Sequence, residues 1–249
     1  MFGKNASENW EKYGAEDPYY GVLSHDRYHM GALDNDAKRA FFESGSDYID
    51  NVVNIITKYI DSGFSPENSL DFGCGVGRLL IPISKISNNT SGVDVSESML
   101  KEARKNIEIF SADNITLIES DDCSDLLSET YDFVHSFIVF QHIPVKYGMA
   151  IFTNIMNSLK PGGIGVLHFT YSNPGLHGIK GGIKRYLPFM KPILRVFKRE
   201  KLQPEMQMNE YELNRIYEKL AIHRVSVVYS EMTDHDGIKG ICLYFKKGG

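Results

Sequence analysis

The stretch from Ser69 to Arg78 combines residue types that can hold an anionic ligand. A short apolar run ends at Asp71-Phe72, and glycines follow at 73, 75 and 77 before an apolar helical pattern. Glycines let the backbone turn sharply and let a ligand approach without meeting a Cβ. The free N–H groups at the start of the following helix would face a carboxylate or a phosphate. The pattern predicts a strand, a tight loop and a helix that together bind the anionic part of a ligand.

A second acidic residue, Asp94, ends the next predicted strand. An acid about twenty residues after such a glycine loop is suited to accept hydrogen bonds from a ribose diol. Dinucleotide sites use G-x-G-x-x-G, whose third glycine allows close packing of helix on strand. Arg78 stands at that third position here. The two motifs therefore predict a nucleoside cofactor, and the glycine spacing argues against a dinucleotide.

The elements that must position these residues alternate along the middle of the chain. Strands are predicted at 69–72, 91–94, 115–118, 132–137 and 164–170, with helices at 77–86, 97–109 and 146–159. This alternation indicates a mostly parallel sheet with helices on both faces, and such sheets bind ligands outside the carboxyl ends of their strands. Asp71, Asp94, Asp122 and Phe137 all fall at predicted strand ends. We therefore expect one cleft to hold them.

The remaining segments divide the chain further. We expect an aromatic N-terminal cap and helix over 1–62, with near-3.6 apolar spacing over 35–62, and a second unit over 63–249. The cap is either an arm packed on the domain or a lid over the cleft. A basic insertion is expected at 171–208, followed by a helix at 209–220. Strands at 222–229 and 240–245 should flank a turn built on Asp236-Gly237.

Composition bounds the class of protein. The chain has 249 residues, 42% of them hydrophobic, which is enough for one α/β domain with elaborations or for two small ones. A net charge of −5 argues against general nucleic-acid binding. The three cysteines have no metal or disulfide spacing, the N-terminus has no apolar signal region, and no apolar run reaches the ~18 residues of a membrane span. We expect a cytoplasmic protein without a metal.

The glycine loop, D-x-G-x-G-x-G, resembles the cofactor loop of class I S-adenosylmethionine (SAM)-dependent methyltransferases. Four further segments are similar to motifs of that family, in the family's order: 93–100, 121–126, 131–137 and 159–163. The chain departs from the family at Asp121, where glycine is usual. The resemblance implies a Rossmann-like, seven-stranded, mostly parallel sheet whose last strand is antiparallel and inserted into the sheet.

The resemblance also implies roles for individual residues. Gly73 and Gly75 would let the backbone approach the methionine part of SAM, and Asp71 would lie near its ammonium. Asp94 would bind the ribose hydroxyls and Met99 would pack against the adenine. Asp122 would accept from the adenine amino group, and the Cys123 N–H would donate to the ring. The expected cofactor contacts are completed by Arg78, Val95 and Phe137.

Methyl transfer to a hydroxyl needs a general base, whereas an amine or a thiolate needs less help. His142, just after the fourth predicted strand, and His168, near the end of the fifth, are the candidate catalytic residues. The alternative is that His142 fixes its loop by a hydrogen bond and that His168 is a packed, hydrogen-bonded side chain. His25, His29 and Tyr20 of the arm are further candidates, and His135, within a strand, is expected to be structural. We favour O-methylation of a small molecule or a glycan, in a bacterial setting suggested by similarity to bacterial members linked to surface glycans.

The basic segment leaves three readings open. Between Lys180 and Lys201 there are eight basic residues and one acid. The segment is a solvated lid, a site for an anionic acceptor, or, through the amphipathic stretch 183–197, a contact with an anionic membrane surface. Neither the acceptor nor the oligomeric state can be read from the sequence.

Two rival functions stay open at this point. One is a SAM-binding sensor or scaffold that transfers no methyl group. The other is an NAD-dependent reductase, against which Arg78 and the absence of a Tyr-x-x-x-Lys pair in the middle of the chain both argue.

Overall fold

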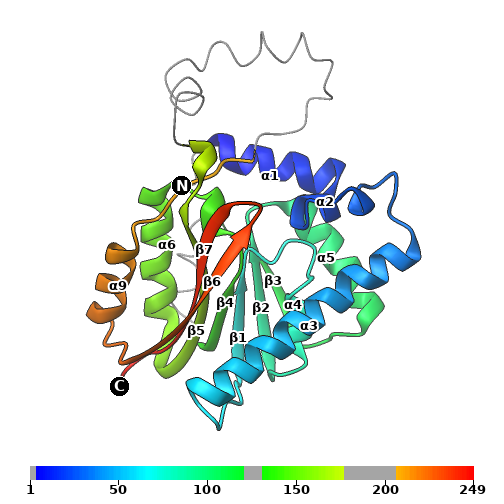
Figure 1. The fold of residues 1–249 in the computed structure, drawn as a ribbon. Helices are drawn as coiled ribbons and strands as arrows, with labels where there is room; N and C mark the ends of the chain where they lie inside the picture. The colour runs from blue at the N-terminus through cyan, green and yellow to red at the C-terminus, as the bar shows by residue number, and fades with distance from the viewer. Residues whose placement is uncertain (1–3, 121–130, 177–205) are drawn as a thin grey trace.

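A computed structural model describes residues 4–120, 131–176 and 206–249, with side chains from residue 7 onward. Its centre is a seven-stranded sheet of order β3-β2-β1-β4-β5-β7-β6 (Figure 1). The strands are β1 (Asn68–Phe72), β2 (Asn89–Asp94), β3 (Ile115–Glu119), β4 (Tyr131–Ser136), β5 (Leu159–Ser172), β6 (Val227–His235) and β7 (Ile238–Lys246).

The pairing directions confirm the expected topology. β1 pairs in parallel with β2 and β4, β2 with β3, and β4 with β5. β7 is antiparallel to both of its neighbours and lies between β5 and β6. The sheet is therefore Rossmann-like and mostly parallel, with the antiparallel last strand β7 inserted between β5 and β6. The first half of the chain crosses from β1 outward to β3 and the second half starts again at β4, so the order reverses between β1 and β4, where such sheets bind ligands.

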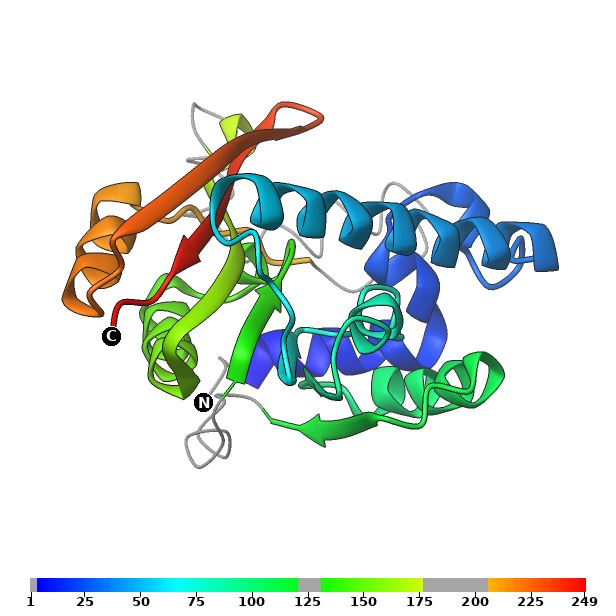
Figure 2. The same ribbon diagram turned by 90° about the horizontal axis from the view of Figure 1, so that it is seen from below.

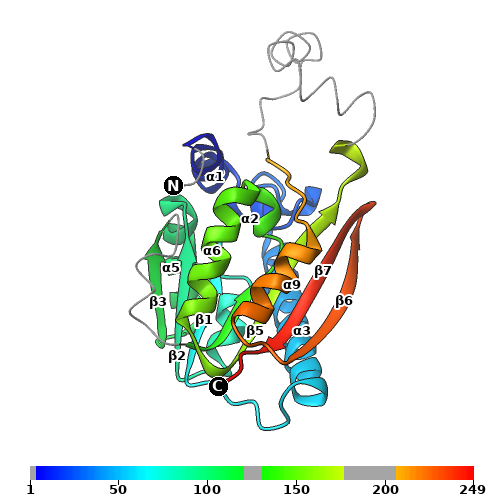
Figure 3. The same cartoon turned by 90° about the vertical axis from the view of Figure 1, so that its left-hand side faces the viewer.

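Helices cover both faces of the sheet, as Figures 2 and 3 show. One face carries α6 (Val145–Ser158) and α9 (Leu213–Ile222), whose apolar side chains pack with Phe140, Phe169 and Phe245 in the largest core cluster. The other face carries α3 (Asn35–Tyr59), which packs its 3.6-period stripe against β4, β5 and β7. On that same side, α4 (Leu80–Ser84) and α5 (Glu97–Phe110) meet through Leu80 and Leu100.

The N-terminal segment is helical and lies across the top of the sheet in Figure 1. It contains α1 (Lys4–Glu16), α2 (Pro18–Val22) and the 3-10 turn η1 (Asp26–Tyr28). Its aromatic residues account for the packing: Tyr13, Tyr19 and Tyr28 are buried with Phe41 and Phe42 of α3 in one cluster. The arm is therefore packed on the domain. The division of the chain at residue 62 stays a prediction.

Several expected elements have different bounds. β5 begins at Leu159, five residues before the strand expected at 164–170, and α9 begins at Leu213, four residues after the start of the helix expected at 209–220. The helix expected at 77–86 is reduced to α4, because Gly77 has φ +91° and Pro82 is tolerated only in a first helical turn. The strand expected at 222–229 was wrong, since α9 extends to Ile222 and β6 runs from Val227 to His235. A two-residue turn at Asp236-Gly237, both with positive φ, requires both strands to reach it, and His235 accordingly pairs with Ile238. Within the described ranges, no helix is both long enough and apolar enough to span a lipid bilayer.

Candidate functional site

A cavity, with about 700 Å³ of empty space when the open solvent at its mouth is included, lies above the carboxyl ends of β1, β2 and β4. Its wall comes from α1, α2, the glycine loop, the start of α5 and the loop after β4. The lining residues are Trp10, Gly21, Val22, Phe72, Gly73, Gly75, Asp94, Val95, Met99, Ser120, Phe137, Ile138, Val139, His142 and Ile143. Of the four residues that the sequence placed at strand ends, Asp94 and Phe137 line this cavity.

The glycine loop follows β1 with left-handed backbone. Gly73 has φ +76° and Gly75 has φ +52°, conformations that glycine adopts without strain. A Cβ on Gly73 would lie 2.3 Å from Cγ2 of Val139, and one on Gly75 would lie 2.8 Å from Cγ2 of Val22. The loop after β4 and helix α2 therefore approach this backbone to within a distance that only glycine permits.

Asp94 ends β2 with its carboxylate in the cavity wall. Oδ2 accepts the Gly75 N–H at 2.8 Å, and Oδ1 accepts the Ser96 N–H at 3.0 Å. Burial raises the pKa of Asp94 to about 6, against the backbone hydrogen bonds, which lower it. The carboxylate is thus fixed in place and short of solvation, which favours a ligand that donates hydrogen bonds to it.

The start of α5 supplies the apolar part of this wall. Ser96 is the N-cap, its Oγ accepting the Met99 N–H at 3.1 Å. The Met99 side chain is buried and lines the cavity between Val95 and Gly21 of α2. A flat, uncharged ring system fits such a surface.

A second, smaller cavity adjoins the glycine loop and is lined by Asp71, Gly73, Cys74, Arg78, Phe137 and Ile138, with Val22, Leu23 and Leu79. The buried Asp71 accepts a hydrogen bond from Nδ1 of His135 at 2.8 Å. Arg78 is also buried; its Nη1 contacts Ser44 Oγ at 3.4 Å, whereas its Nε has no hydrogen-bond partner. A buried carboxylate beside an under-satisfied guanidinium suits a ligand that carries both an ammonium and a carboxylate.

His142 lines the main cavity but is fully engaged. Its Nδ1 donates to the Gln207 carbonyl at 2.8 Å, so the neutral ring presents Nε2 to the Gln141 side-chain amide at 3.2 Å. The Trp10 ring meets the imidazole edge-on at 4.9 Å. Burial lowers the pKa of His142 to about 4, although the bond to Gln207 raises it. The ring is therefore neutral at pH 7, and it ties the cavity wall to the segment 206–212.

His168 lines neither cavity. Its Nε2 bonds to Thr233 Oγ1 at 2.8 Å, and its ring lies 5.0 Å from that of Phe137, which does line both. Burial, with a smaller contribution from His235, lowers the pKa of His168 to about 3. This histidine is one side chain removed from the cavity wall.

The remaining candidates from the N-terminal arm and from β4 lie outside both cavities. Tyr20 stacks on His29, which pairs with Asp17, and none of them lines either cavity; His25 is exposed. His135 is held between Asp71 and Tyr48, as expected of a structural residue. Asp122 and Cys123 lie outside the described residues, as does most of the basic insertion.

Several wall residues were not singled out as site residues from the sequence, among them Trp10, Gly21, Val22, Ser120, Ile138, Val139 and Ile143. Trp10 carried a signal, because the aromatic density of the arm indicated either packing on the domain or a lid over the cleft. Ile138 has φ +61°, which is strained for a β-branched residue and has no signature in a sequence. No group of three or more His, Cys, Asp or Glu side chains that could hold a metal occurs among the residues described.

Comparisons with known proteins agree with this geometry. A family model described as "Methyltransferase domain" matches residues 70–163. A ubiquinone biosynthesis O-methyltransferase of Hydrogenovibrio crunogenus is 32% identical over 95 residues, which are 38% of this chain and 39% of the relative. A carboxy-S-adenosyl-L-methionine synthase of Alteromonas mediterranea is 28% identical over 132 residues, 51% of this chain and 54% of the relative. The chain thus spans about half or less of the length of these relatives.

Solved structures share the fold over nearly the whole chain. A magnesium protoporphyrin IX methyltransferase from Synechocystis with bound SAM superimposes with a TM-score of 0.62 at 18% identity, covering 98% of this chain and 97% of that one. An N-methyltransferase from Bradyrhizobium japonicum in complex with S-adenosyl-L-homocysteine gives 0.58 at 12% identity, covering 97% and 100%. At such identities the likeness concerns the fold. Residues 70–163 therefore match a methyltransferase domain, and the whole chain has the fold of these SAM-dependent methyltransferase structures, the family that its motifs resemble.

Proposed function

We propose that this chain transfers a methyl group from SAM to a small-molecule or glycan acceptor. One observation carries the proposal: the glycine loop, Asp94, Met99 and the Asp71–Arg78 pair lie around two adjoining cavities. The adenine, the ribose and the amino-acid end of SAM would then each have a surface to bind: Met99, Asp94 and the residues Asp71 and Arg78, respectively.

The residues present fit the cofactor. Asp94 would hold the ribose diol, because its carboxylate lines the cavity and is fixed there by backbone N–H groups, among them those of Gly75 and Ser96. Met99 and Val95 would pack on the adenine. Asp71 would face the ammonium, and the guanidinium of Arg78, which lines the smaller cavity, would donate to the methionine carboxylate. Phe137 borders both cavities and would lie between the two ends of the ligand.

SAM, when bound, supplies an electrophilic methyl group on a sulfonium. The chain's own residues then need to align an acceptor and exclude water. Trp10, Val22 and Ile143 provide an apolar wall for this purpose. The arm 4–34 would act as a lid over the cofactor, since α1 and α2 contribute to that wall.

The acceptor chemistry follows from His142, which is the candidate base that reaches the cavity. A base of pKa about 4, already accepting from Gln141, is too weak to activate an aliphatic alcohol. Among small-molecule and glycan hydroxyls, we therefore favour an acidic one, such as a phenol, whose pKa of about 10 makes deprotonation easier, over the aliphatic hydroxyl of a glycan. His168 would act on the acceptor only through Phe137, as a packing residue.

The remaining parts of the proposal come from the sequence. We propose a bacterial, cytoplasmic enzyme that works without a metal. The basic residues of the insertion 171–208 would bind anionic groups of the acceptor. The membrane-surface reading of 183–197 is kept as the less favoured role, and nucleic acid is not the proposed partner.

Calorimetric titration with SAM and with S-adenosyl-L-homocysteine tests the proposal. We expect micromolar binding by the wild type and its loss in Asp94→Ala. Labelled SAM should then methylate a phenol from a panel of phenols, sugars and amines. Binding without turnover on any acceptor would favour the sensor or scaffold function, whereas binding of a nicotinamide dinucleotide in place of SAM would refute the proposal.

A further inference from the structure

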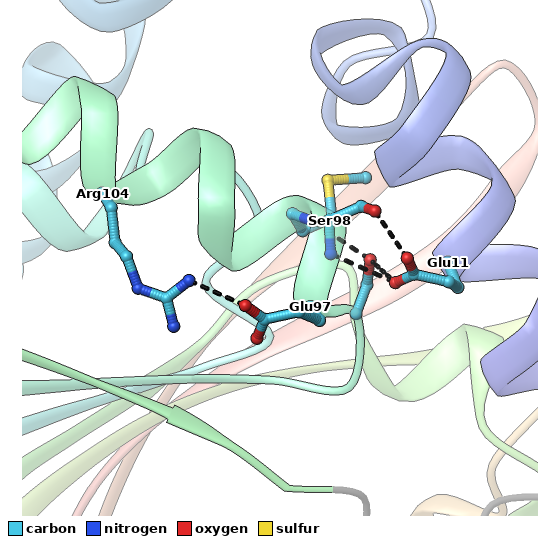
Figure 4. A network of polar contacts seen from close by, with 6 residues as sticks. Glu11, Glu97, Ser98 and Arg104 are labelled. Carbon is cyan, nitrogen blue, oxygen red and sulfur yellow. Dashed lines mark hydrogen bonds and ion pairs between the residues drawn. The ribbon is translucent and has the colours of Figure 1, made fainter.

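One carboxylate of helix α1 binds the start of α5, beside the cofactor wall. Glu11 reaches the start of α5, where its Oε2 accepts from Ser96 Oγ at 2.8 Å and from the Ser98 N–H at 3.2 Å. Its Oε1 accepts from Ser98 Oγ at 2.5 Å (Figure 4). A carboxylate at a helix N-terminus is favoured both by the free N–H groups and by the helix dipole. Glu11 therefore joins two helices that are far apart in the sequence.

Glu11 does not line the cavity, but its partners lead directly to residues that do. Ser96 donates its hydroxyl proton to Glu11, while the same oxygen accepts the Met99 N–H. The Ser96 N–H donates to Oδ1 of Asp94. One residue thus connects the Glu11 carboxylate to the two side chains that face the adenosine half of the site.

The neighbouring residues of α1 show that the fit is close. A Cβ on Gly14 would lie 2.5 Å from Ser96 Oγ and 2.8 Å from the Met99 nitrogen, so α1 touches α5 at a place where no side chain fits. Trp10, the one tryptophan of the chain, precedes Glu11 and lines the cavity beside His142. When Glu11 is bound to α5, Trp10 is held in the cavity wall.

We propose that Glu11 is a positioning residue which couples the closed position of α1 to cofactor binding. The inference rests on the proposed function and extends it, since it assigns affinity for SAM to a residue outside the site. Partial burial raises the pKa of Glu11, but the hydrogen bonds from Ser98 and Ser96 outweigh it, and the net pKa is lowered. The carboxylate is accordingly charged in the closed arrangement, where its charge-assisted hydrogen bonds are strong.

Glu11→Gln tests this coupling, because it keeps the shape and removes the charge. We expect about a tenfold weaker affinity for S-adenosyl-L-homocysteine by calorimetry, equivalent to the loss of one charge-assisted contact. Glu8→Gln and Glu16→Gln are matched controls: both residues are exposed on the same helix, and both should bind like the wild type.

The fluorescence emission wavelength of Trp10 reports the position of α1 in the folded protein, so a change in the free energy of unfolding alone leaves it unchanged. In Glu11→Gln we expect red-shifted emission without ligand, because Trp10 leaves the cavity wall, and recovery at saturating ligand. The same substitution in a Ser98→Ala background should have a smaller effect, since one of the three hydrogen bonds to Glu11 is then already lost. Equal effects of Glu11→Gln in both backgrounds would overturn the coupling.

Gly14→Ala separates docking from folding. Alanine favours a helix more than glycine does, so α1 itself should be retained while its approach to α5 is blocked. Gly31→Ala, where a Cβ meets nothing within 4 Å, is the control. Weak binding by Gly14→Ala with a near-native far-ultraviolet spectrum would support the inference. Wild-type affinity in both Glu11→Gln and Gly14→Ala would overturn the role of Glu11 and leave the proposed function intact. A wild type that binds no ligand would refute the proposed function itself.

Discussion

Cofactor affinity should fall on acidification because of Asp94. Its pKa is raised to about 6 by burial, and a carboxylate binds a ribose diol better than a protonated carboxyl does. With that pKa, about nine-tenths of the protein carries ionised Asp94 at pH 7 and about one-tenth at pH 5. The affinity for S-adenosyl-L-homocysteine should therefore drop by about tenfold between those pH values, provided that the bound carboxylate stays ionised.

Two other titratable groups, His142 in the cavity and Glu11 beside it, keep their charge state in this range. His142, with a pKa of about 4, stays neutral from pH 5 to 7, and the lowered pKa of Glu11 keeps that carboxylate charged. The assay is calorimetric titration at half-unit intervals between pH 5 and 8, on the wild type and on Asp94→Asn. The variant should bind about a hundredfold more weakly at pH 7, since two charge-assisted hydrogen bonds of about 1.5 kcal/mol each are weakened.

The ligand-free protein should show the opposite pH dependence of stability. An acid whose pKa is raised by folding destabilises the folded state once pH exceeds its unfolded value, so the free energy of unfolding should decrease from about pH 4 to about pH 6 through this group. Wild-type affinity that is flat between pH 5 and 7, or a pH slope that persists in Asp94→Asn, would refute the assignment of the raised pKa to Asp94.

Three further predictions can be tested together. Gly73→Ala should destabilise the protein by about 2 kcal/mol more than Gly162→Ala in chemical denaturation: both positions have positive φ, but only at Gly73 does a Cβ collide with Val139. Equal losses would show that strain alone matters. Arg78→Met should weaken binding of S-adenosyl-L-homocysteine by about tenfold yet leave adenosine binding unchanged, as calorimetry with both ligands would reveal, and a parallel loss for adenosine would contradict the proposed carboxylate contact. The imidazole of His142 should titrate near pH 4 in a nuclear magnetic resonance titration, because burial lowers its pKa; a midpoint near the ordinary value of about 6.5 would mean that the ring is solvated.

Local patterns were sufficient for the sheet. Period-2 and 3.6 patterns, with glycine at each tight turn, located all five parallel strands to within a few residues, because buried strands of this kind are read as short apolar runs. Where the pattern was weaker, the predicted bounds were wrong. The apolar run after the glycine loop contains Pro82, which limits α4 to Leu80–Ser84. The bounds of β6 depend on its pairing with β7 across the Asp236-Gly237 turn.

The sequence by itself determined one side of the cavity in which we propose that the cofactor binds. Its glycines, Asp71 and Asp94 belong to strand ends, and parallel strands place their ends at one edge, so proximity followed from order along the chain. Only the tertiary structure decided the protonation and contacts of the histidines, because burial and hydrogen-bond partners come from segments distant in sequence: Gln207 for His142 and Thr233 for His168. The docking of α1 through Glu11 was also beyond the sequence, since a surface carboxylate has no pattern that names its partner eighty-five residues away.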